Sequence, residues 1–144
     1  MRSVFFHIKT DRDPIVKVLN DNYISNGDGW INKTETMFIG LWDEFDKEVE
    51  FELWKTVGDV FGEDRYVSIA VDISGRVPGD AEVMECMELF LGNNFGYAHD
   101  DYSDNLWSYS DIKSGALKSG HPFFDYDGWF NAGLTNRLTG AGNV

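Results

Sequence analysis

Residues 65–74, RYVSIAVDIS, constrain the fold more than any other stretch of the chain. The segment is β-branched and nearly continuous in apolar residues, which predicts a strand that is buried on both faces in the middle of a sheet. Such a strand needs neighbouring strands at its sides and other elements above and below it. We therefore expect a layered protein in which this strand lies near the centre.

Other strands and helices are predicted along the chain before this segment. Residues 3–9 and 34–42 have the apolar, β-prone composition of strands. Residues 11–23 begin with an aspartate that can cap a helix, and a proline lies in the first turn. Residues 25–30, SNGDGW, contain two glycines and are interpreted as a loop.

Residues 80–92 predict the clearest helix, with Asp80 as its expected N-cap. Its apolar face consists of Val83, Met84, Met87, Phe90 and Leu91. Three glutamates are expected to form an acidic stripe on its outer side: Glu82, Glu85 and Glu88. The helix also holds the lone cysteine, Cys86, which we expect to be buried and structural. A single cysteine leaves no internal disulfide and no cysteine-based zinc site.

The segment 43–62 allows two interpretations. Residues 48–53, EVEFEL, alternate between acidic and apolar side chains as a strand does. A helix accounts for more of the apolar residues, with Phe51 as its misfit, and is the preferred prediction. The helical face would consist of Phe45, Val49, Leu53, Val57, Val60 and Phe61.

The order of these elements is β-α-β-α-β-α, followed by a mixed region. It predicts a single-domain α+β or α/β sandwich, in which a small central sheet is packed by two to four helices. At 144 residues the chain has the length of one domain. We expect that domain to span residues 1–130 and residues 131–144 to form a flexible tail.

No apolar run has the length needed to span a bilayer, and the N-terminal apolar stretch is too short for a signal peptide. The sequence therefore predicts a cytoplasmic protein. It contains no GxGxxG or GxxxxGK[ST] phosphate-binding loop and no GxSxG nucleophile elbow. We expect no enzyme activity, no catalytic residues and no cofactor.

Charge is the strongest global signal, with 25 acidic residues against 12 basic ones and a net charge of −13. The excess is concentrated in residues 37–127, which hold 20 acids and six bases. Nucleic acid and anionic membranes are repelled by such a field, whereas a basic protein is attracted to it. Acidity also keeps a domain soluble, so charge alone does not identify a partner.

Residues 97–112, YAHDDYSDNLWSYSDI, are the densest cluster of polar chemistry in the chain. A metal site is one interpretation, because carboxylate oxygens and an imidazole can bind divalent ions. Its ligands would be His99, Asp100, Asp101 and Asp104. The spacing does not match an EF-hand loop, and further histidines are available only at His7 and His121. We therefore predict no metal ion in this protein.

A structural interpretation needs no ligand. The Asp and Ser side chains can satisfy backbone groups in a polar turn, and Trp107 can enter the core. Ser108 or Ser110 can cap a short helix that has Asp111 in its first turn.

A third interpretation is a docking surface for a basic protein, with Tyr102 and either Trp30 or Trp42 as apolar anchors. Acids of residues 43–64, which hold nine acids against two lysines, would extend this surface. The candidate binding residues are Asp43, Glu44, Asp46, Asp100, Asp101, Tyr102 and Asp104.

The run FGYAHDDYSDNLW, residues 95–107, and the following SYSDI resemble a pattern of small bacterial immunity proteins of contact-dependent growth inhibition and related polymorphic toxin systems. The resemblance extends at most over residues 66–112. It implies a protein that binds the C-terminal domain of a cognate toxin and blocks its active site. Many such toxins are basic nucleases that act on tRNA or DNA.

Our leading hypothesis is therefore a non-enzymatic inhibitor that binds a basic toxin domain, and neither nucleic acid nor a membrane. One alternative is a DNA mimic that binds a nucleic-acid-binding protein, which would use the same electrostatics. A third possibility is a metal-dependent hydrolase built on His99 and the aspartates that follow it.

Overall fold

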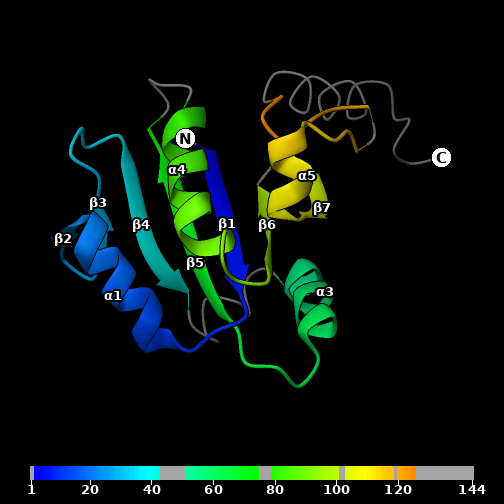
Figure 1. The fold of residues 1–144 in the computed structure, drawn as a ribbon, viewed down its shortest axis with the longest axis horizontal. Helices are drawn as coiled ribbons and strands as arrows, with labels where there is room; N and C mark the ends of the chain where they lie inside the picture. Colours follow the sequence, from blue (N-terminus) through cyan, green and yellow to red (C-terminus); the bar gives the residue numbers. More distant parts are fainter. Residues whose placement is uncertain (1, 43–50, 75–78, 101–102, 119, 126–144) are drawn as a thin grey trace.

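The computed structural model describes residues 2–42, 51–74, 79–100, 103–118 and 120–125. They form a single-domain α+β fold, an open seven-stranded antiparallel sheet with four helices in the described ranges (Figure 1). The predicted fold class is therefore confirmed in its α+β form. The acidic segment 43–50 and the expected tail, residues 131–144, lie outside the described residues.

The sheet has the strand order β2-β3-β4-β5-β1-β6-β7, and every neighbouring pair is antiparallel. The strands are β1 Arg2–Ile8, β2 Ile24–Asn26, β3 Gly29–Ile31, β4 Met37–Trp42, β5 Val67–Ile73, β6 Gly96–Asp100 and β7 Ser103–Trp107. Strand β5 is the fourth of the seven and most of its residues are buried, as its continuous apolar sequence predicts.

The helices are α1 Arg12–Asn22, α3 Phe51–Phe61, α4 Asp80–Leu91 and α5 Tyr109–Ser114. Helix α4 lies over β1 and β5, and α1 lies beside it over the β3–β4 side of the sheet (Figure 1). Helix α3 contributes buried side chains to a different cluster, on the opposite face. The sheet is thus covered on both faces, by α1, α4 and α5 on one face and by α3 on the other.

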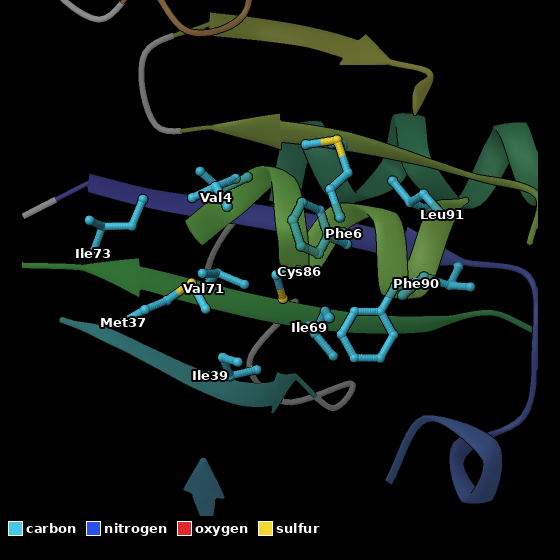
Figure 2. Packing of buried hydrophobic residues seen from close by; sticks show 14 of the residues in the cluster. Val4, Phe6, Met37, Ile39, Ile69, Val71, Ile73, Cys86, Phe90 and Leu91 are labelled. Carbon is cyan, nitrogen blue, oxygen red and sulfur yellow. The ribbon is translucent and has the colours of Figure 1, made fainter. Parts of the chain in front are cut away.

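The main core lies between the sheet and α1, α4 and α5. Alternate residues of β1 and β5 point into it, and α4 adds Cys86 and Phe90 from above (Figure 2). Its strand residues are Val4, Phe6, Ile8, Trp30, Met37, Ile39, Ile69, Val71, Ile73, Ala98 and Trp107. The intervening residues Phe5 and Ala70 point to the other face, where they pack against Val57 and Phe61 of α3.

The helix predictions hold with corrections at their ends. Helix α3 confirms helix over strand for residues 51–61, and Val57 and Phe61 are buried as expected. Val60 is 44% exposed, so its assignment to the apolar face is wrong. The N-cap of α4 is Gly79, in the left-handed conformation with φ 75°, and Asp80 is the first helical residue, not the cap.

Two hairpins form where the sequence predicts loops or turns. Residues 25–30 belong to β2 and β3, which are joined by a two-residue turn at Gly27 and Asp28. Gly27 has φ +62°, at the first loop position, where type II′ hairpin turns require glycine. Residues 96–100 and 103–107 form the strands β6 and β7, where the sequence predicts a polar turn. These four strands are short, and only β3 and β6 pair with strands outside their own hairpin, β4 and β1.

Candidate functional site

The β6–β7 hairpin carries most of the polar residues that the sequence marks as candidates. Strand β6 pairs with the N-terminal strand β1, which places His99 opposite Phe5 and Asp100 opposite Val4. Because side chains alternate along a strand, His99 and Asp100 point to opposite faces of the sheet. Val4 belongs to the main core and Phe5 to the cluster under α3, which identifies the two faces.

His99 lies in a stack of buried rings on the α3 face. Its ring centroid is 4.8 Å from that of Phe5 and 4.8 Å from that of His7, with interplanar angles of 20° and 14°. The Nδ1 atom of His7 lies 2.9 Å from the Oγ atom of Ser68 on β5. Burial lowers the pKa of His99 to about 4, so its imidazole is neutral at pH 7.

Asp100 is only 4% exposed, on the face that holds the main core. The hypothesis that its carboxylate is presented to a partner is therefore wrong for this residue. Asp100 points into the core because side chains alternate along β6 and because β6 pairs with β1 in this register. The run of aspartates by itself predicts neither the strand nor its register.

The opposed directions of His99 and Asp100 do not favour a metal ion held by both side chains. Among the residues that the structure describes, no group of three or more His, Cys, Asp or Glu side chains could hold a metal ion. His121 is engaged locally, since its Nδ1 atom lies 2.8 Å from a carboxylate oxygen of Asp125.

The structural role predicted for the second half of the motif is confirmed. Trp107 is fully buried and meets Phe123 edge to face, with ring centroids 5.7 Å apart. Ser108 is the N-cap of α5, where its hydroxyl accepts a hydrogen bond of 3.1 Å from the backbone N–H of Asp111. These residues support the fold, whether or not a partner binds.

The remaining docking candidates lie beyond what the structure describes. They are Asp43, Glu44, Asp46, Asp101 and Tyr102, together with the side chain of Asp104. Their role stays a prediction. Of the proposed anchors, Trp30 is buried and donates a hydrogen bond of 2.9 Å from its indole nitrogen to Asn20, so it is not a contact residue.

Cys86 is fully buried in α4, as predicted. Burial raises the pKa of its thiol to about 12, so the reactive thiolate does not form at neutral pH. Burial also raises the pKa of the neighbouring Tyr23 hydroxyl. The cysteine has the environment of a core residue.

The outer side of α4 carries the acidic stripe that its sequence predicts. Glu85 and Glu88 are exposed and Glu82 is partly exposed. Residues 80–91 contain four acids and no basic residue. Among the ion pairs between described residues, none involves these three glutamates.

An aromatic cluster at one end of the sheet was not foreseen as a group. Phe61 at the end of α3 stacks on Tyr66 with centroids 4.5 Å apart and meets Phe95 edge to face at 6.1 Å. Phe95 in turn meets Tyr97 at 5.3 Å. The available signal was Phe95, an aromatic residue directly after the polar Asn93 and Asn94 that follow the predicted helix 80–92.

Comparison with protein-family models, with curated proteins and with solved structures gave no match. Within the described part of the chain, no helix is long and apolar enough to cross a membrane.

Proposed function

We propose that this protein is an immunity protein that binds a cognate bacterial toxin domain, a basic nuclease, and covers its active site with an acidic surface. The observation that carries the proposal is the acidic stripe of α4, Glu82, Glu85 and Glu88, which no described cation neutralises. The resemblance of residues 95–112 to immunity proteins supports the same function.

The stripe is unfavourable for the isolated protein in part, although Glu82 lies in the first turn of α4, where the helix dipole favours an anion. Like charges one helical turn apart repel each other, at a cost of about 0.2–0.5 kcal/mol per pair. Glu88 lies in the last turn of α4, where the negative end of the helix dipole disfavours an anion and where no basic residue is present. A basic partner placed over α4 would convert this repulsion into attraction.

The same charges would accelerate the encounter with such a partner. A protein with a net charge of −13 attracts a basic domain over roughly a Debye length, about 8 Å at physiological ionic strength. Substrate nucleic acid, by contrast, is repelled. The inhibitor would therefore occupy a site that is shaped for phosphate without itself binding nucleic acid.

The proposal predicts that a toxin gene lies beside the gene of this protein, and it is tested with the C-terminal domain of that toxin. Binding is measured by calorimetry and by stopped-flow association, and protection by the loss of nuclease activity. The triple variant Glu82→Gln, Glu85→Gln, Glu88→Gln should slow association about tenfold at low salt and much less at high salt.

A matched control neutralises three exposed acids in the N-terminal third, Asp13→Asn, Asp28→Asn and Glu35→Gln. It makes the same change in net charge and should slow association by less than about threefold, because steering depends on where the charges lie. An absence of binding and of protection would refute the proposed function. Equal slowing of association by the two triple variants would show that the acidic stripe of α4 has no particular role in binding.

A further inference from the structure

We propose that Asn26, which ends β2 at the turn to β3, is a site of spontaneous covalent modification, where the side-chain amide is lost and the residue becomes aspartate or isoaspartate. The sequence supplies the first condition, because Asn26 is directly followed by Gly27 and no other asparagine of the chain precedes a glycine. The inference stands apart from the proposed function and rests on the geometry of the β2–β3 hairpin.

The reaction takes place within the chain and consumes only water. The backbone nitrogen of Gly27 loses its proton to a base and attacks the side-chain Cγ atom of Asn26. A bond forms between this nitrogen and Cγ, the bond between Cγ and Nδ2 breaks, and the amide group takes up a proton and leaves as ammonia. Water then hydrolyses the five-membered succinimide. Opening at one carbonyl group yields aspartate and opening at the other yields isoaspartate, without oxidation or reduction.

The attacking nitrogen belongs to the residue that the turn leaves most open. Gly27 has no side chain to shield its nitrogen, and an added Cβ atom would meet nothing within 4 Å. In a hairpin with a two-residue loop, the flanking pair of Asn26 and Gly29 closes the ladder, so the N–H of Gly27 is not needed for strand pairing. None of the loop and turn hydrogen bonds between described backbone groups involves Gly27.

The amide under attack is equally accessible. Asn26 is exposed, and its side chain makes no hydrogen bond with a residue that the structure describes. Attack requires the peptide group between Asn26 and Gly27 to rotate. This rotation disturbs few hydrogen bonds, because β2 has three residues, lies at the edge of the sheet and pairs with β3 alone (Figure 1).

Other asparagines lack this combination. The side-chain oxygen of Asn32 accepts hydrogen bonds from the backbone N–H groups of Thr36 and Met37, at 2.9 and 3.1 Å. The amide of Asn94 donates to the carbonyl of Phe90 at 3.0 Å. These bonds hold the amides away from the next backbone nitrogen.

The neighbouring pair Asp28–Gly29 has the same spacing but a different environment. An added Cβ atom on Gly29 would collide with the carbonyl oxygen of Ile39, so β4 lies close against this glycine. Gly29 also pairs with Asn26 in the ladder. The structure therefore favours reaction at Asn26 over Asp28.

Modification changes the hairpin in two ways. It adds one negative charge, which takes the net charge of the chain from −13 to −14. Isoaspartate also adds one carbon atom to the backbone of the two-residue turn, which disturbs the register of Ile24 with Ile31. The isoaspartate form should therefore lose hydrogen-exchange protection in β2 and β3, while the central strand β5 keeps its protection.

The test is incubation of the folded protein at pH 8 and pH 9, followed by peptide mapping with mass spectrometry. The peptide that contains Asn26 should gain about 1 Da, and the rate should rise about tenfold between the two pH values, because attack needs the deprotonated nitrogen. Asn26→Gln should remove this modification. The matched control Asn93→Gln, which changes another exposed asparagine, should leave the rate at Asn26 unchanged.

The same incubation in urea measures the rate in the unfolded chain. Because edge strands open at little cost, the rate at Asn26 in the folded protein should lie within about tenfold of the rate in urea. Stronger protection by the fold, or faster conversion of Asn93 than of Asn26 in the folded protein, would overturn the inference. No toxin enters this experiment, so its result leaves the proposed function untouched.

Discussion

The folding stability of this protein should fall as the pH drops from 7 to 5, because His99 is buried as a neutral ring. Its pKa is about 4 in the folded protein and has the ordinary value of 6.5 when the chain is unfolded. Between these values the unfolded state binds a proton that the folded state does not accept. Lowering the pH therefore favours unfolding, by up to about 1.4 kcal/mol per pH unit.

Integrated from pH 7 to pH 5, this difference amounts to roughly 2 kcal/mol of lost stability. The matched variant is His99→Phe, which keeps an aromatic ring between Phe5 and His7 but cannot be protonated. Any packing cost of the larger ring is the same at both pH values. The wild type and His99→Phe differ in their free energy of unfolding. The change in this difference between pH 7 and pH 5 is thus the contribution of His99.

The measurement is urea unfolding of wild type and variant at several pH values between 7 and 5, followed by tryptophan fluorescence. The wild type should lose roughly 2 kcal/mol more than His99→Phe over this range. Parallel pH profiles for the two proteins would show that the imidazole is not buried as a neutral ring, and would refute the reasoning.

Three further predictions concern the scaffold. Ser108→Ala removes the hydroxyl that caps α5 and should cost about 1 kcal/mol in urea unfolding, which Ser108→Asp should largely restore. Gly96→Ala should destabilise by more than about 2 kcal/mol, because its Cβ atom would meet the carbonyl of His7. Gly58→Ala in α3, where an added Cβ atom meets nothing within 4 Å, should instead stabilise the protein by about 0.5–1 kcal/mol. Equal changes in unfolding free energy for Gly96→Ala and Gly58→Ala would contradict the close approach of Gly96 to β1. Cys86 should not react with a thiol reagent in the folded protein but should react fully in urea, and rapid labelling of the native state would show that α4 opens.

Local sequence patterns predict some features of the candidate site and not others. The capping role of Ser108 and the burial of Trp107 follow from residue chemistry, because a hydroxyl before a helix and an indole among polar neighbours have few other uses. The direction of Asp100 does not follow, since it depends on pairing with β1, almost a hundred residues earlier. The exposure of Phe95 likewise depends on where α3 packs.

The amino-acid sequence by itself determined the central strand β5, the buried face of α4 with Cys86, the acidic stripe outside it, and the strongly negative charge. Each of these depends on side-chain type and on spacing within one segment. Only the tertiary structure decided that the short segments of β2, β3, β6 and β7 become strands, because their hydrogen-bond partners lie elsewhere in the chain or across a short turn. It also decided that His99 and Asp100, neighbours in sequence, lie on opposite faces of the sheet, since strand pairing sets the face to which each side chain points.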